Sequence, residues 1–154
     1  MRRFRQKLSR PVFPAPHQRL VQIIVDTSAW IEYLRATGSK VDRYVGECLQ
    51  NKQDLLMPAV VLQELLQGAR TPQHYIELHK QLDAVPRFEP FDPYDLHSQA
   101  AMLYARCRWQ GLTIRNPIDC VVAACAIEAE CPLLARDVDF KHIASVDQRL
   151  ILLP

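Results

Sequence analysis

Four acidic residues stand beside apolar segments, where an ionised side chain is costly. Asp26 ends the aliphatic run VQIIV, and Asp137 follows LLAR near the end of the chain. Asp119 lies in the otherwise apolar stretch NPIDCVVAACAI, and Glu64 lies in the helical pattern AVVLQELLQGA. A carboxylate beside a hydrophobic core costs on the order of several kcal/mol unless it is paired, hydrogen-bonded or bound to a cation. These four residues therefore need partners or a shared cation.

Grouped carboxylates indicate metal-dependent chemistry. Like charges repel, and the common remedies are a shared proton or a bound cation. Hard oxygen ligands without histidine or cysteine suit Mg²⁺ or Mn²⁺. A carboxylate-bound Mg²⁺ is most often used in phosphoryl transfer, where it activates water and neutralises charge on the phosphate. Each acid also has a structural alternative: a helix cap for Asp26 and Asp137, a helix-dipole partner for Asp119, and a solvent-facing position or a pair with Arg70 for Glu64.

Other motifs argue against several other chemistries. The four glycines are scattered, so the sequence has no glycine-rich phosphate cradle of an NTPase or a dinucleotide enzyme. The stretch DTS, which starts at Asp26, lacks the second aspartate of an aspartyl-phosphate phosphatase. No histidine is paired with another histidine or a cysteine at zinc-binding spacing. The cysteines are interpreted as reduced core thiols of a cytosolic protein: Cys48, Cys107, Cys120, Cys125 and Cys131.

Strand-like and helix-like segments alternate after residue 20. Strands are predicted at 21–25, 54–58, 85–91, 131–135 and 149–153, and helices at 29–36, 41–51, 59–69, 72–84, 93–110, 117–130 and 137–144. Thr27 or Ser28 is expected to cap the first helix, and Asn116 the helix that begins at Pro117. This alternation predicts a three-layer α/β domain with a mostly parallel sheet. Ligands of such sheets bind beyond the carboxyl ends of the strands, where Asp26 and Asp137 fall.

The chain length of 154 residues suits one domain, which we place at residues 21–154. Residues 1–20 form a basic, proline-rich tail with six basic residues and no acid, expected to be mobile unless a partner orders it. The tail either binds RNA phosphates or is a solvated extension. No run reaches the roughly 18 apolar residues of a membrane span, and no apolar segment follows the basic start as in a secretory signal. We therefore expect a cytoplasmic protein without membrane contact.

Three stretches resemble a known family. They are VDTSAWIEYL, AVVLQELLQGAR and NPIDCVVAACAIEAECPLLARDVDF, and their order and spacing are specific to PIN-domain ribonucleases. Over residues 21–154 the chain resembles most of all the VapC toxins of bacterial type II toxin–antitoxin pairs. The resemblance implies a three-layer α/β/α PIN-like domain with Mg²⁺, or Mn²⁺ as a substitute, as cofactor. It also implies an endoribonuclease toxin that cleaves transfer or ribosomal RNA and so inhibits translation and growth.

The resemblance assigns roles to individual residues. Asp26, Glu64, Asp119 and Asp137 match the acids that bind the metal and carry catalysis in the family. Ser28 matches the hydroxyl residue that supports the first aspartate.

Further positions near these acids complete the expected site. Asn116 is counted with Ser28 as a supporting residue, and Asp139 is expected to be structural or to act from the outer shell of the site. The candidate phosphate contacts for the substrate are Arg35, Lys40, Arg43, Arg70 and Arg115, of which Arg115, beside the helix start, is preferred. The family usually has a polar residue two positions before the last of its four acids, and here that position is Ala135. A supporting hydrogen bond for Asp137 is therefore expected to be missing.

The resemblance further implies a homodimer and a small cognate antitoxin whose C-terminal segment lies across the active-site groove. Six residues on two helices are candidate contacts or, alternatively, core residues at helical spacing: Trp30, Tyr33, Leu34, Leu62, Leu65 and Leu66, with Trp30 and Tyr33 preferred. Two other functions stay open. One is a catalytically weak PIN-like module that binds RNA or a partner protein, and the other is a DNA-directed nuclease that uses the same acids.

Overall fold

A short parallel sheet forms the centre of the computed structural model, which describes residues 22–153; the predicted tail at 1–20 lies outside the described residues. β1 (Ile23–Val25) lies between β2 (Leu55–Leu56) and β3 (Leu133–Leu134), and pairs in parallel with both. Ile24 stands opposite Leu56 on one side and Leu133 on the other. Every residue of the three strands is buried. Strands covered on both faces read as continuous apolar runs, which is why the sequence shows no alternation here.

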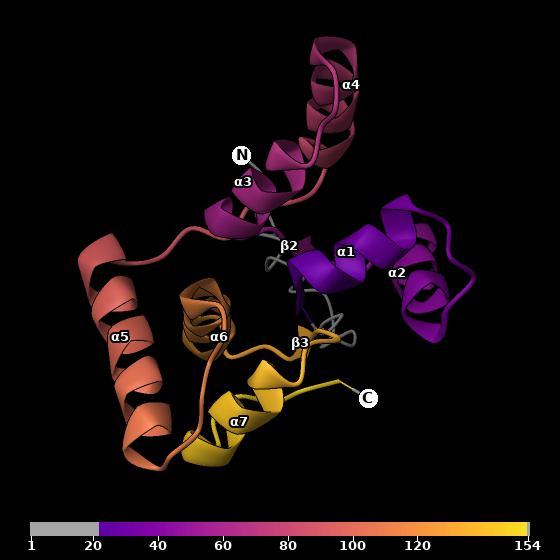
Figure 1. Cartoon of the computed structure of the whole chain (residues 1–154). Coiled ribbons are helices and arrows are strands. Elements are labelled where there is room, and N and C mark those ends of the chain that lie inside the picture. Colours follow the sequence, from indigo (N-terminus) through magenta and orange to yellow (C-terminus); the bar gives the residue numbers. More distant parts are fainter. Residues whose placement is uncertain (1–21, 154) are drawn as a thin grey trace, which may run out of the picture.

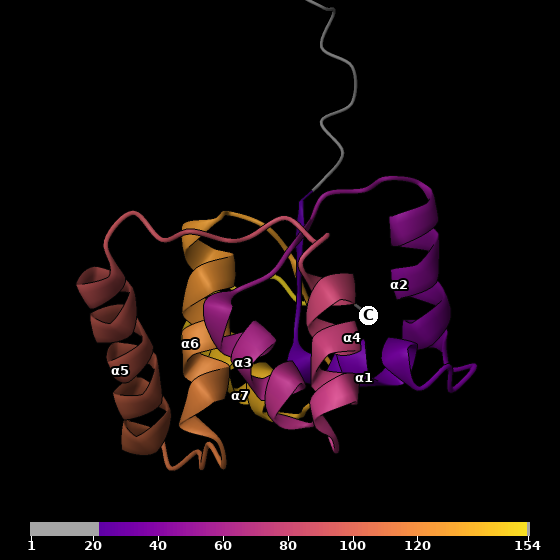
Figure 2. The same cartoon turned by 90° about the horizontal axis from the view of Figure 1, so that it is seen from above.

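Helices cover both faces of this sheet, as the three-layer α/β/α prediction required. The described helices are α1 (Thr27–Leu34), α2 (Lys40–Gln50), α3 (Ala59–Gln67), α4 (Pro72–Leu82), α5 (Pro93–Trp109), α6 (Pro117–Glu128) and α7 (Asp139–Val146). Figures 1 and 2 show α1 and α2 on one side of the strands, and α6 with α5 outside it on the other. The fold class predicted from the sequence is therefore confirmed.

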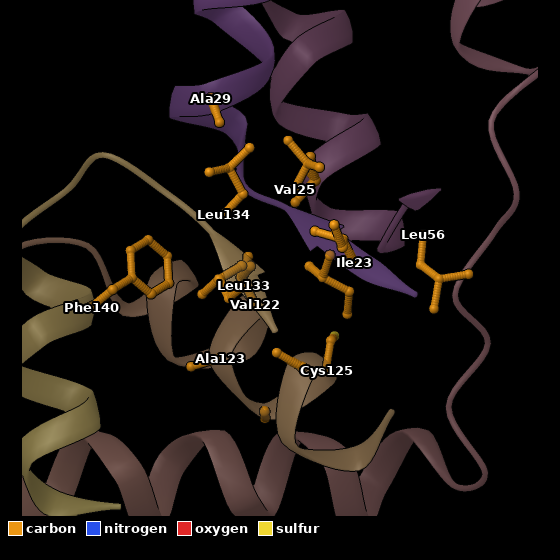
Figure 3. Packing of buried hydrophobic residues seen from close by; sticks show 14 of the residues in the cluster. Ile23, Val25, Ala29, Leu56, Val122, Ala123, Cys125, Leu133, Leu134 and Phe140 are labelled. Carbon is orange, nitrogen blue, oxygen red and sulfur yellow. The ribbon is translucent and has the colours of Figure 1, made fainter. Parts of the chain in front are cut away.

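The core is built around α6. Its residues from Asp119 to Ile127 are buried except Val121, because α6 is covered by the sheet on one side and by α5 and α7 elsewhere. Figure 3 shows side chains of β1 and β3, such as Ile23 and Leu133, packed over Val122 of α6. The Asn116-Pro117 start is confirmed: the Asn116 side chain accepts a hydrogen bond from the backbone N–H of Ile118, 3.1 Å away. A local capping signal thus places the first turn of the most buried helix.

Three details of the sequence prediction were wrong. The strands predicted at 85–91 and 149–153 are reduced to single bridges, Met57 with Arg87 and Leu133 with Leu152. In the first of these segments, prolines at 86 and 90 supply no N–H for a longer ladder. Thr27 and Ser28 do not cap α1; Asp26 does, which confirms the structural alternative given for that acid. The last helix begins at Asp139 rather than at residue 137, and it ends at Val146.

All five cysteines are free and buried, as the sequence analysis expected. Burial raises the pKa of the Cys120 and Cys125 thiols to about 12, so these side chains stay protonated and act as small apolar groups. Within residues 22–153, no helix combines the length and apolarity needed to cross a membrane.

A buried carboxylate fastens the end of α7. Asp147 accepts hydrogen bonds from Arg149 Nε at 3.0 Å and from Arg106 Nη1 at 3.2 Å. The hydrogen bonds from Arg149 lower the pKa of this carboxyl below its ordinary value of 3.8. Asp147→Asn is therefore expected to lower the free energy of unfolding at pH 7 by about 1–3 kcal/mol.

The contribution of Asp147 to stability depends on pH, and urea denaturation can measure this dependence. The pKa of Asp147 is lower in the folded state than in the unfolded state. Its contribution to the free energy of unfolding is therefore complete above its pKa in the unfolded state, and it is lost as the pH falls through its pKa in the folded state. The difference between wild type and Asp147→Asn should thus be full at pH 7 and shrink below about pH 4. A difference that stays constant down to pH 3 would contradict this assignment.

Candidate active site

Asp26 lies at the carboxyl end of β1 and joins the sheet to α1. Its Oδ2 accepts hydrogen bonds from the Ser28 backbone N–H at 3.0 Å and from Ser28 Oγ at 2.6 Å. Ser28 Oγ in turn accepts from the backbone N–H of Arg136 at 3.0 Å, which follows β3. The Ser28 hydroxyl therefore links the segment that follows β1 to the segment that follows β3. Burial raises the pKa of Asp26, and the hydrogen bonds from Ser28 oppose this rise.

Glu64 reaches the same edge of the sheet from α3. Its Oε2 accepts a hydrogen bond from Thr27 Oγ1 at 2.5 Å, and its Oε1 lies 3.4 Å from the donor Asn116 Nδ2. Within residues 22–153, the partners of the Glu64 carboxylate are Thr27 and Asn116, and the alternative ion pair with Arg70 is not formed. Asn116 thus has two roles, because its Oδ1 caps α6 while its amide nitrogen contacts Glu64. Sequence reasoning treated Thr27 only as a possible cap, although its hydroxyl beside Asp26 was a signal for a role in the site.

Asp119, Asp137 and Asp139 form a close group. Each offers one carboxylate oxygen that lies within 4.8 Å of the other two, close enough to share one cation. Asp119 comes from the first turn of α6, Asp139 from the start of α7, and Asp137 from the segment after β3. The structure therefore places Asp139 beside the acids of the predicted site. The signal in the sequence was its spacing of two residues from Asp137.

The charges of this group are incompletely compensated. The pKa of Asp119 is raised from 3.8 to about 7, first by burial and then by repulsion from Asp26, Asp137, Asp139 and Glu64. Asp26 and Glu64 are thus near enough to Asp119 to disfavour its charged form, together with Asp137 and Asp139. An all-oxygen donor set of this kind fits a hard divalent cation, which would remove the repulsion.

Asp137 is positioned without help from residue 135. Ala135 packs against the core and offers no side-chain hydrogen bond, as the sequence indicated. Asp137 Oδ1 instead accepts a hydrogen bond from the backbone N–H of Asp139 at 3.0 Å and pairs with the guanidinium of Arg115. The neighbouring loop therefore supplies the support that the side chain at 135 lacks.

The basic residues considered for substrate contact lie in different surroundings. Arg115 is ion-paired with both Asp137 and Asp139, although most of its side chain is exposed to solvent. Arg43 donates from Nη1 to the carbonyl of Gly38 at 2.6 Å. Arg35 lines a hollow of about 380 Å³ that also includes Glu64. No hydrogen bond of Lys40 or Arg70 side chains to the acids occurs in the described residues.

Comparison with known proteins identifies the family of the chain. The family model described as PIN domain matches residues 23–146. The chain belongs to the PIN-domain family. Among its relatives are VapC ribonuclease Mb1587 of Mycobacterium bovis and ribonuclease VapC11 of Mycobacterium tuberculosis. Each is 34% identical over 125 residues, which cover 80% of this chain and 92% of the relative. The resemblance to VapC-type PIN domains is therefore confirmed.

Solved PIN-family structures share the fold. VapBC2 from Rickettsia felis, bound to a DNA fragment from its promoter, matches with a TM-score of 0.65 and 19% identity, over 86% of this chain and 97% of the other. VapBC-1 from nontypeable Haemophilus influenzae matches with a TM-score of 0.66 and 18% identity, over 86% and 96%. At these identities the likeness concerns the fold of this PIN domain.

Proposed function

We propose that this PIN domain is a metal-dependent endoribonuclease that cleaves cellular RNA, inhibits growth as a toxin and is neutralised by a cognate antitoxin. The observation that carries the proposal is the group of Asp119, Asp137 and Asp139 beyond the carboxyl ends of the strands, with Asp26 and Glu64 near enough to affect Asp119. The names of the VapC ribonuclease relatives support RNA as the substrate.

The metal would be held by Asp26, Glu64, Asp119 and Asp137, with Asp139 added from its position in the group. Mg²⁺ is the proposed ion, and Mn²⁺ a plausible substitute, because carboxylate oxygens suit both. Such an ion supplies activation of water and neutralisation of phosphate charge when bound. Ser28 and Thr27 hold Asp26 and Glu64 in fixed orientations, so the carboxylates keep their places as a substrate arrives.

A hollow beside Glu64 suits an antitoxin segment. It lies between α1, α3 and α4, and its lining combines apolar side chains, including Leu34 and Leu65, with Arg35 and Glu77. Trp30, a preferred contact in the sequence analysis, is only 1% exposed and packs in the core, so that expectation was wrong. Tyr33 is half-buried against Trp30, at a ring-centroid distance of 6.1 Å. One solved structure with a similar fold, VapBC-5 from Mycobacterium tuberculosis, is a member of the VapBC family of toxin–antitoxin systems, which supports an antitoxin as partner. The homodimer stays a prediction.

The test is incubation of purified, antitoxin-free protein with total cellular RNA in Mg²⁺, in Mn²⁺ and in excess EDTA. We expect discrete cleavage products in either metal and none in EDTA. Single- and double-stranded DNA in parallel reactions distinguish the DNA-directed nuclease. If the protein binds RNA but leaves it intact in both Mg²⁺ and Mn²⁺, the binding module replaces the nuclease as the function of this chain.

A further inference from the structure

We propose that the Arg115 guanidinium is an internal counter-ion that competes with the divalent cation for Asp137 and Asp139, and that cation binding frees it to bind a phosphate of the substrate. The inference rests on the proposed function, because it takes the acidic group to be the metal site. It concerns a residue of the chain whose present contacts are all with the acids of that group.

The contacts of Arg115 place a positive charge directly on two members of the acidic group. Its Nη2 pairs with Asp137 Oδ1, and its Nε lies 3.3 Å from Asp139 Oδ1. Asp119 lies within the same group of carboxylates, yet it has no hydrogen bond from Arg115. The guanidinium therefore already pairs with two of the three carboxylates that a shared cation would bind. Two positive charges cannot occupy one small group of acids without repelling each other.

The side chain of Arg115 is free to leave, whereas its backbone is fixed. The backbone N–H of Arg115 donates to Asp139 Oδ2 at 2.8 Å, and the next residue, Asn116, caps α6. The side chain itself is 64% exposed, and its partner Asp137 is 37% exposed. The pair with the exposed Asp137 is weak. Asp139 is only 2% exposed, so its carboxylate needs a counter-charge, which a divalent cation would supply as the guanidinium leaves. The fixed backbone keeps the displaced group beside the site, where a planar guanidinium matches two phosphate oxygens.

The experiment measures Mn²⁺ binding by isothermal titration calorimetry, without RNA, for wild type, Arg115→Gln and Arg136→Gln. Arg136 is the matched control: it adjoins Asp137 in the chain and is 53% exposed, but its side chain pairs with Glu32. Both substitutions remove one positive charge from the same neighbourhood. We expect Arg115→Gln to bind Mn²⁺ about tenfold more tightly than wild type, because a competing charge is gone. Arg136→Gln should change the affinity by about twofold or less, since exposed charges are screened by salt.

The outcomes separate this inference from the proposed function. Unchanged or weaker Mn²⁺ binding in Arg115→Gln overturns the competition, and so does equal tightening in both variants. Absence of Mn²⁺ binding in wild type would instead overturn the metal site itself. As a second readout, Arg115→Gln should raise KM for RNA by about tenfold although it binds metal more tightly. A variant that gains metal affinity and keeps its KM would overturn the phosphate contact.

Discussion

Asp119→Asn is expected to reduce RNA cleavage by about 100-fold or more and, without metal, to make the protein more stable. Asparagine keeps the size of the side chain but removes one charge from the acidic group. The loss of activity follows because a neutral amide is a poorer ligand for a hard cation. The gain in stability follows because Asp119 is buried among four other carboxyls in the folded state.

The stability gain depends on pH. The pKa of Asp119 is about 7 in the folded protein and 3.8 as its ordinary value, so the folded state holds the proton more tightly. The destabilisation by this group is absent below about pH 4, grows as the pH rises, and is complete above about pH 7. Urea denaturation in EDTA should therefore show Asp119→Asn more stable than wild type by about 1–4 kcal/mol at pH 8, and by less at pH 5.

Asp95→Asn is the matched control. Asp95, like Asp119, is the third residue of a helix that begins with proline, but it is exposed on α5 and lies outside the acidic group. Its replacement should cost about 0.5 kcal/mol through the helix dipole and leave cleavage unchanged. If Asp119→Asn and Asp95→Asn changed stability equally at pH 8, repulsion within the acidic group would not be the cause.

Ser28→Ala should lower cleavage by about 10- to 100-fold, although Ser28 is not a metal ligand. The hydroxyl both donates to Asp26 and accepts from the backbone N–H of Arg136. Without it, the Asp26 carboxylate and the backbone just before Asp137 each lose a hydrogen bond that holds them in place. Ser28 is thus a positioning residue. The measurements are kcat and KM for RNA cleavage together with Mn²⁺ affinity, and weaker Mn²⁺ binding is expected along with the lower kcat.

Two further variants show whether Ser28→Ala lowers cleavage by misplacing Asp26 or by destabilising the whole domain. Ser28→Thr retains the hydroxyl and should restore most of the activity. Thr71→Ala removes a comparable hydroxyl, the α4 cap that accepts from the His74 N–H at 3.1 Å, outside the site. It should lower the free energy of unfolding by about 1 kcal/mol with cleavage unchanged. Cleavage by Ser28→Ala at the wild-type rate would show that Asp26 needs no support from this hydroxyl.

Much of the architecture could be predicted from local patterns. The apolar runs before Asp26 and after Cys131 predicted the central parallel strands, and Asn116-Pro117 predicted the start of the buried helix. These signals are local, because a capping side chain acts on backbone groups two or three residues away. The parallel topology then places the carboxyl ends of the strands at one edge, so an approximate location for the acids followed from order alone.

The contacts that define the site were decided by tertiary structure. Thr27 bonds Glu64 across 37 residues, and Arg115 meets Asp139 across 24. The sequence suggested Trp30 as an interface residue, whereas packing buries it. It also suggested Arg115 as a phosphate contact, which stays a prediction, but it did not indicate the ion pairs of Arg115 with Asp137 and Asp139.

Local sequence patterns and tertiary contacts act over different distances along the chain, and this explains which features could be predicted. The sequence by itself determined the fold class, the buried central helix and the segments that carry the acids, because periodicity and capping depend on neighbouring residues. Only the tertiary structure decided which carboxylates share a cation-sized space and which hydroxyl or guanidinium supports each one. Those choices depend on how segments far apart in the chain come together, and hydrogen-bond geometry tolerates errors of only a few tenths of an ångström.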